Sequence, residues 1–335
     1  DDMDFSGIAM TANLFDIKQI EVLRGPQNTR FGQNAIAGLI NIQTNEPTPY
    51  QESMVEATIG QDNQRELGVM TSGAFSTQKN APQYRVTLFK HNSDGFRRNA
   101  TLNRNDTNAR DEQTFRAKLR FYPNDDSQID IALLHADLNN GYDAWSRDND
   151  FTTRSNQPGK DTQLSNAVSI KATSTANPNV QLIAKTSFVN SDMLYRYDED
   201  WTSASNGTYL NKKHRRTLSQ ELRWVSTPLS RIANTTDWLF GLYASKLDES
   251  NQTEYWGSSN SDFTLVKAAA FTQFDYHFSA KSTVTFGLRA EHNNSDFSNS
   301  AHETYSPEEA LWGANLTYRH IYNPTYTAFA GITRG

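Results

Sequence analysis

The feature that most constrains this chain is a two-residue alternation of apolar and polar side chains. In Thr114–Tyr122, apolar residues take every second position, and the positions between them carry Arg116, Lys118 and Arg120. A period of two is typical of a β-strand, because successive side chains point to opposite faces of a sheet. Burying an unpaired cation is very costly, so the polar face must meet water or carboxylates. The segment therefore predicts a strand with one apolar face and one charged face.

The same alternation recurs along the chain. We count about thirteen such segments, the first of them near Ser53, which predicts an all-β, antiparallel meander. The clearest apolar rows after Thr114–Tyr122 are Ile129, Ile131 and Leu133; Val168, Ile170 and Ala172; Trp238, Phe240, Leu242 and Ala244; Ala270, Thr272, Phe274, Tyr276 and Phe278; Val284, Phe286, Leu288 and Ala290; and Trp312, Ala314, Leu316 and Tyr318.

Alternation alone fits a soluble β-sandwich as well as a membrane barrel, and the connections separate the two classes. After the first two strands, short turns and long loops are predicted to alternate, as they do between the two rims of an outer-membrane barrel. The long loops are expected at about residues 93–110, 139–161, 191–213, 249–262 and 293–306. Aromatic residues also fall near strand ends, where an interfacial girdle needs them: Phe121, Tyr122, Trp238, Phe278, Trp312 and Tyr318. These features favour a transmembrane β-barrel.

Composition agrees with this interpretation and excludes other classes. Hydrophobic residues make up 36% of the 335 residues and aromatic residues 11%, which suits strands that bury only alternate side chains. No apolar run approaches the roughly 18 residues that a membrane helix needs. The chain has no cysteine, which excludes disulfides and thiolate metal sites. Its net charge is -6 and it has no basic block, so no nucleic-acid partner is expected.

One segment, residues 20–44, stands apart from the strand pattern. Two short apolar strands flank a connection that is punctuated by Gly25-Pro26, Gly32 and Gly38, residues that suit tight turns. The segment resembles the plug-domain signature of TonB-dependent outer-membrane receptors. The residues that carry the resemblance are Phe15-Asp16-Ile17, Glu21-Val22-Leu23-Arg24-Gly25-Pro26, Phe31-Gly32, Asn34-Ala35-Ile36-Ala37-Gly38 and Ile40-Asn41-Ile42. Arg30 departs from the family, which usually has Leu before the aromatic residue and Gly.

The resemblance implies an N-terminal plug domain inside a barrel of about 22 strands. We assign residues 1–47 to the C-terminal part of the plug and residues 48–335 to the N-terminal part of the barrel, with the boundary at the Pro-broken linker Asn45–Pro49. An odd number of strands and an open edge in lipid are both unfavourable. We therefore expect a fragment truncated at both ends, without the N-terminal box that the energising protein TonB grips.

The candidate site residues fall into two groups. The plug signature is represented by Glu21, Arg24, Gly25, Pro26, Gly32, Gly38 and Asn41, of which Arg24 and, less directly, Glu21 are expected to contact the barrel wall. On that wall, charged residues are expected to face the lumen: Arg116, Lys118, Arg120, Asp130, Lys171, Lys185, Glu221, Arg223, Arg289, Glu291 and Arg319. The sequence has no catalytic motif and no histidine arrangement with metal-ligand spacing. We therefore expect no enzyme activity, no resident metal and no cofactor.

Aromatic residues in the predicted long loops are the candidate ligand contacts: Tyr142, Trp145, Tyr197, Trp201, Tyr255 and Trp256. Interleaved with Asp, Arg and Asn, they would suit a bulky ligand such as a ferric siderophore, although they would also serve to pack the loops against one another. The resemblance implies a monomer in the bacterial outer membrane that imports a scarce solute with the help of TonB. Cobalamin, haem and oligosaccharides remain open as ligands, and a passive porin is the less favoured alternative.

Overall fold

The computed structural model describes residues 1–5, 8, 13–24 and 38–334. The described chain is built of strands and one 3-10 helix, η2 (Pro228–Ser230), and it has no helix long and apolar enough to cross a bilayer. The strands are β1 (Ile17–Arg24), β2 (Gly38–Thr44), β3 (Glu52–Ile59), β4 (Arg65–Ala74), β5 (Gln83–Ser93), β6 (Arg98–Asn99), β7 (Arg110–Asn124), β8 (Ser127–Tyr142), β9 (Thr152–Thr153), β10 (Gly159–Asn177), β11 (Val180–Asp198), β12 (Thr208–Ser226), β13 (Thr236–Glu254), β14 (Ser258–Ser279), β15 (Ser282–Asn299), β16 (Thr304–Tyr305), β17 (Glu308–Ile321) and β18 (Thr327–Arg334).

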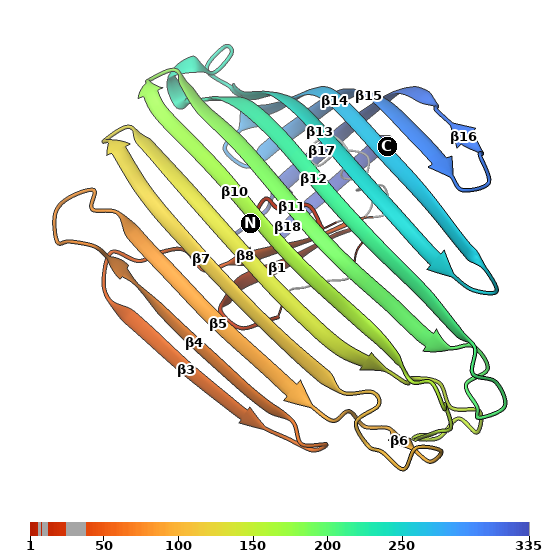
Figure 1. The fold of residues 1–335 in the computed structure, drawn as a ribbon. Coiled ribbons are helices and arrows are strands. Elements are labelled where there is room, and N and C mark those ends of the chain that lie inside the picture. Colours follow the sequence, from red (N-terminus) through yellow and green to blue (C-terminus); the bar gives the residue numbers. More distant parts are fainter. Residues whose placement is uncertain (6–7, 9–12, 25–37, 335) are drawn as a thin grey trace.

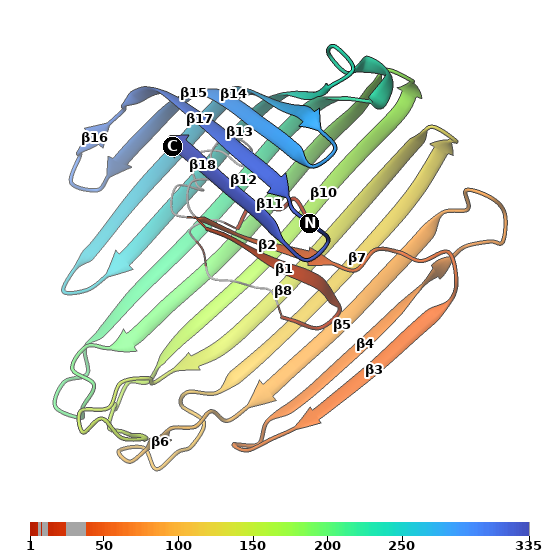
Figure 2. The ribbon, with the colours of Figure 1, turned by 180° about the vertical axis from the view of Figure 1, so that it is seen from behind.

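The long strands form one antiparallel sheet in which neighbours in the chain are neighbours in space. Its order is β3-β4-β5-β7-β8-β10-β11-β12-β13-β14-β15-β17-β18, and β16 pairs with β15 outside this path. The sheet curves like a wall around the β1–β2 hairpin, which lies on its concave side (Figures 1 and 2). The predicted meander of about thirteen strands, starting near Ser53, is confirmed: β3 begins at Glu52.

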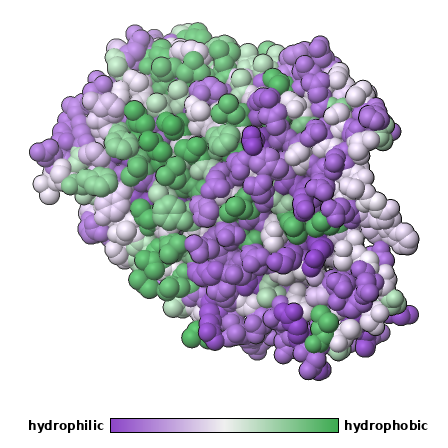
Figure 3. Space-filling view, in the orientation of Figure 1, coloured by the Kyte–Doolittle hydropathy of each residue, from purple (hydrophilic) through white to green (hydrophobic). Residues whose placement is uncertain are grey.

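The two faces of the sheet are reversed relative to a soluble protein. On the convex face, large apolar side chains are exposed, among them Leu133, Phe188 and Leu288. On the concave face, polar side chains such as Ser165 and Ser191 are fully buried. Figure 3 shows the hydrophobic side chains gathered over the upper left of the convex face and hydrophilic ones over the lower right. An apolar outer band around a polar interior is the arrangement of an outer-membrane barrel, and it excludes a β-sandwich.

The strands are much longer than a bilayer requires. Strands β10 to β14 have 19 to 22 residues, whereas about 9–11 tilted residues cross the hydrocarbon. The outward apolar row of β11 is Leu182, Ala184 and Phe188, and the next outward residues are Asn190 and Asp192. The last third of β11 therefore lies beyond the apolar band. We call this end of the sheet, where β6 and β9 also lie, the loop end, and the opposite end the turn end.

The predicted loop boundaries need correction at the loop end. Residues 191–198 and 208–213 are paired strand, so that loop shrinks to residues 199–207, and the predicted loop at 249–262 shrinks to the tight turn at residues 255–257. At the turn end, residues 227–235 form a longer connection that contains η2. Short and long connections therefore do not alternate strictly. The cause is composition: where neither face of a strand meets lipid, both carry polar residues, and such strands look like loops in sequence.

The β1–β2 hairpin forms a separate two-stranded sheet. Its register places Ile20 opposite Ile42 and Val22 opposite Ile40. Residues 45–51 connect it to β3. The division of the chain into a plug at residues 1–47 and a barrel at residues 48–335 remains a prediction.

Candidate functional site

A buried ion pair anchors the hairpin to the concave wall. Asp16 immediately precedes β1 with a positive φ of 56°, which aims its carboxylate at Arg85 on β5. Arg85 donates to it through Nε (2.7 Å) and Nη2 (2.5 Å), and through Nη1 to Glu52 of β3 (2.5 Å). The side chains of Arg85 and Asp16 are 7% and 2% exposed. A planar guanidinium bound by two carboxylates is a strong and directional contact.

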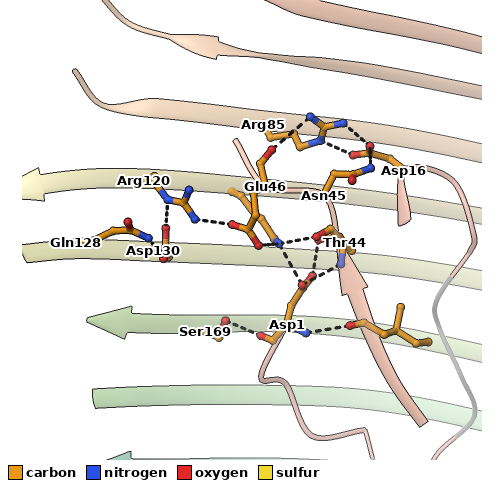
Figure 4. Close-up of polar contacts among 12 residues, drawn as sticks. Asp1, Asp16, Thr44, Asn45, Glu46, Arg85, Arg120, Gln128, Asp130 and Ser169 are labelled. Atoms are coloured by element: carbon orange, nitrogen blue, oxygen red, sulfur yellow. Dashed lines mark hydrogen bonds and ion pairs between the residues drawn. The ribbon is translucent and has the colours of Figure 1, made fainter. Parts of the chain in front are cut away.

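A second group of ion pairs surrounds Glu46, in the segment that leaves the hairpin. Its carboxylate accepts from Arg120 (2.6 Å) and from Lys118 (3.2 Å), both on β7. Arg120 also donates to Asp130 of β8 at 2.6 Å. Figure 4 shows this group beside the Arg85–Asp16 pair, on adjacent strands of the same wall. Because Ile17 lies opposite Thr44 in the antiparallel register, both groups of ion pairs hold the same end of the hairpin, where β1 begins and β2 ends.

The first residues of the chain make further contacts with the wall. The Asp1 carboxylate lies 3.1 Å from Lys118 Nζ, and the Asp1 carbonyl accepts from Ser169 Oγ on β10 at 3.0 Å (Figure 4). Asp2 accepts from Lys185 of β11 at 2.7 Å. Carboxylates of the inserted segment therefore meet cations on β5, β7 and β11.

Of the plug signature, the structure describes Glu21, Arg24, Gly38 and Asn41, all of them in the β1–β2 hairpin. Glu21 accepts from Asn41 Nδ2 at 2.7 Å and from Gln43 Nε2 at 3.2 Å, which ties β1 to β2. Arg24 pairs through its backbone with Gly38, whose φ of 150° suits glycine. Gly25, Pro26 and Gly32 lie outside the described residues, and wall contact by the Arg24 side chain stays a prediction.

Asp1, Asp2, Asp16 and Glu46 make ion pairs with the wall. The sequence marks Asp16 only as part of the plug signature and indicates no partner for it. The available signal was a group of carboxylates flanking the hairpin, set against a row of cations expected to face the lumen. The sheet places that row on the concave face, because its members alternate with the exposed apolar residues.

The second candidate site is an aromatic cluster at the loop end. It joins all six predicted rings with two more, Tyr195 and Tyr209. Trp201 stacks on Tyr197 with ring centroids 5.2 Å apart and planes at 3°, and Tyr197 stacks on Tyr209 at 4.9 Å. The remaining contacts are Tyr142–Tyr195, Tyr142–Trp201, Trp145–Trp201, Tyr195–Tyr197, Tyr195–Tyr209, Tyr209–Tyr255 and Tyr255–Trp256.

Strands, rather than loops alone, position these rings. Tyr142 ends β8, Tyr197 lies on β11 and Tyr209 on β12, at positions that face the concave side. Tyr209 sits directly opposite Tyr197, so register brings the two rings together. The placement of Tyr142 and Tyr197 in loops is therefore corrected. Trp256, in the turn after β13, is the most exposed of the cluster at 86%.

Tyr195, a member of the cluster, and Asp161, its register partner on β10, both have raised pKa values. Burial raises the pKa of the Tyr195 hydroxyl, and a hydrogen bond between Tyr195 and Tyr142 raises it further. Asp161, directly opposite Tyr195 on β10, has its pKa raised by burial and by the charge of Glu112. Both groups lie beyond the apolar band. The cluster presents ring faces and hydroxyls, a surface suited to a bulky, partly apolar ligand. Among the described residues, no group of three or more His, Asp or Glu is placed to hold a metal ion.

No protein-family model matches the chain. The pesticin receptor of Yersinia enterocolitica is 23% identical over 296 residues, which are 84% of this chain and 42% of that protein. The ferric yersiniabactin uptake receptor FyuA from Yersinia pestis superimposes with a TM-score of 0.83 at 18% identity, over 94% of this chain and 51% of that one. The chain has the fold of a TonB-dependent outer-membrane receptor.

A second solved structure supports this assignment. The siderophore receptor PiuA from Acinetobacter baumannii matches this receptor fold with a TM-score of 0.76 at 11% identity, over 97% of this chain and 55% of that one. The chain thus spans about half the length of the relatives it matches. The described receptor fold comprises the curved wall, the inserted hairpin and the aromatic cluster at the loop end.

Proposed function

We propose that this chain is part of a receptor that takes up a ferric siderophore through the bacterial outer membrane with energy supplied by TonB. The observation that carries the proposal is the hairpin held inside the curved wall by ion pairs. A lumen filled by an inserted segment opens only when that segment moves. A passive porin has no need of such a segment, so the porin alternative is disfavoured.

The aromatic cluster supports a bulky ligand that arrives from outside. It lies beyond the apolar band, at the end of the sheet that faces the medium in receptors of this fold. The relatives are named as receptors rather than enzymes, which agrees with a role in binding and transport. TonB would act through a segment that precedes the described hairpin, and the receptor would work as a monomer.

Uptake of radioactive iron tests the proposal in cells that express the full-length receptor. A panel of ferric catecholate, hydroxamate and mixed-ligand chelates is supplied to a strain with TonB and to one without it. The proposal expects at least one chelate to be accumulated only with receptor and TonB together. Cobalamin, haem and an oligosaccharide are tested in parallel, and uptake of one of these alone would assign a different ligand. Uptake that is equal in the two strains would support a porin.

A further inference from the structure

Two pairs of cations face each other directly across neighbouring strands of the concave wall. Arg85 of β5 is the register partner of Lys118 of β7, and Lys171 of β10 is the partner of Lys185 of β11. Side chains at such positions have Cβ atoms about 4.5–5.5 Å apart, and like charges there destabilise a sheet. The wall thus contains two unfavourable arrangements that a simple exchange of residues would remove.

The same wall shows that opposite charges are available as partners. Lys185 also lies opposite Glu221 of β12, and Lys171 opposite Asp130 of β8. The cations nevertheless outnumber the carboxylates of this region. Around the contacts with the inserted segment, the cations are Arg85, Arg116, Lys118, Arg120, Lys171, Lys185 and Arg223, and the wall carboxylates that contact or face them are Glu52, Asp130 and Glu221.

The inserted segment supplies the missing negative charge. Asp16 binds Arg85, Glu46 binds Lys118 and Arg120, and Asp2 binds Lys185 at 2.7 Å. Arg116 donates to the carbonyl of Phe15. Each facing pair of cations is thus covered by a carboxylate that belongs to a different part of the chain. If the inserted segment moves, the wall keeps its positive charge but loses the carboxylates that neutralise it.

The side chains beside these cations are small. The row that contains Lys118 continues across β8, β10 and β11 with Ala132, Ser169 and Ser187. Asp1 now occupies the space over Ser169. Small side chains therefore line the way between the cation pair on β5 and β7 and the one on β10 and β11.

From these observations we propose that the concave wall of β5 to β11 is an anion-conducting track, masked at rest by carboxylates of the inserted segment. This proposal rests on the proposed function, and it assigns an anionic ferric chelate, rather than a neutral one, as the class of substrate. The track attracts the anion once the segment has moved, because a confined surface of one sign raises the local concentration of the opposite charge. The facing cations destabilise the sheet, and on this proposal they are kept because they attract the anion.

Ion selectivity of the full-length receptor in a planar bilayer tests the track. Urea displaces the inserted segment at a concentration that leaves the β-sheet circular dichroism unchanged, and a potassium chloride gradient then gives the permeability ratio of chloride to potassium. We expect a conductance that favours chloride and a lower ratio in K171Q/K185Q. The charge-preserving variant K171R/K185R should keep the wild-type ratio. The control K212Q/K246Q removes the same charge from the convex face and should also keep it.

Four results would overturn the track. They are no conductance in urea, a wild-type preference for potassium, an unchanged ratio in K171Q/K185Q, and an equal fall in the convex-face control. The measurement does not depend on iron or on TonB. A receptor that conducts chloride as expected but accumulates no ferric chelate would contradict the proposed function and leave the track standing.

Discussion

Arg85 and Asp16 are 69 positions apart in sequence and form a buried ion pair with two hydrogen bonds, from Nε and Nη2 of the guanidinium. The pair joins a strand of the curved wall to the hairpin that fills it. The pair must therefore break if the hairpin moves away from the wall, as the proposed transport requires.

Removing one partner of this pair should loosen the hairpin. Asp16→Asn leaves buried Arg85 with Glu52 as its only carboxylate partner, and breaking a buried pair in this way costs about 3–5 kcal/mol. We expect faster hydrogen exchange of β1 and β2 amides and displacement of the hairpin at lower urea. Lys79→Ala is the control, because its pair with Asp125 is 79% and 66% exposed and such pairs contribute about 0–1 kcal/mol. Equal sensitivity of the two variants would contradict the anchoring role.

The aromatic cluster should depend on Trp201 more than on Trp256. Trp201 contacts Tyr142, Trp145 and Tyr197, whereas Trp256 contacts Tyr255. Each aromatic pair contributes about 0.5–1.5 kcal/mol beyond area burial. Trp201→Ala should therefore lower the thermal midpoint of the loop end, followed by tryptophan fluorescence, and weaken ligand binding. Trp256→Ala should change stability by less than about 0.5 kcal/mol. A larger loss of stability in Trp256→Ala than in Trp201→Ala would show that the contacts among the aromatic rings do not stabilise the loop end.

Asp161 should make the loop end less stable as the pH rises. Its pKa is raised in the folded state, so the folded chain holds this proton more tightly than the unfolded chain. The stabilising contribution is then full below the ordinary value of 3.8 and is lost as the pH climbs through the folded pKa. Asp161→Asn removes the charge and should raise the unfolding midpoint at neutral pH.

A matched control with the opposite sign lies in the loop between β5 and β7. The Arg104 guanidinium lowers the pKa of Asp106 through two hydrogen bonds, 2.7 and 2.9 Å long. That contribution is present above the ordinary pKa and is lost as the pH falls through the folded value. Asp106→Asn should therefore lower stability slightly near neutrality. If Asp161→Asn and Asp106→Asn shift stability in the same direction, the assignment for Asp161 is wrong.

Gly241 of β13 makes room for an aromatic ring on the concave face. A Cβ at this position would lie 2.2 Å from Cζ of Phe271, whose ring sits between the guanidinium groups of Arg223 and Arg289. Gly241→Ala should destabilise the sheet by about 1–3 kcal/mol through overpacking. Combining it with Phe271→Ala should abolish most of that added cost, as measured by a double-mutant cycle. Additive losses would mean that the two residues do not compete for this space.

The sequence was enough to predict the sheet and its two faces, because lipid imposes a strict period of two on strands such as Thr114–Tyr122 in β7. It was not enough to predict where strands end beyond the lipid. There, Ser191–Asp198 of β11 has polar residues on both faces, and pairing with β12 decides its structure. The six predicted aromatic residues converge because register aligns them, yet Tyr209 could not be found without that register. The pair of Asp16 with Arg85 depends on how the hairpin sits in the wall, which local patterns do not specify.

The most direct test of the account is to join the hairpin to the wall covalently. These 335 residues contain no cysteine, so Asp16→Cys with Arg85→Cys introduces one defined thiol pair in a full-length receptor whose remaining sequence has any cysteine replaced by serine. A short thiol-reactive crosslinker should reduce TonB-dependent uptake of radioactive iron to the level of a strain without TonB, while ligand binding at the cell surface persists and the untreated variant still transports. Uptake by the crosslinked receptor at the rate of the untreated one would contradict the claim that this hairpin must leave the wall.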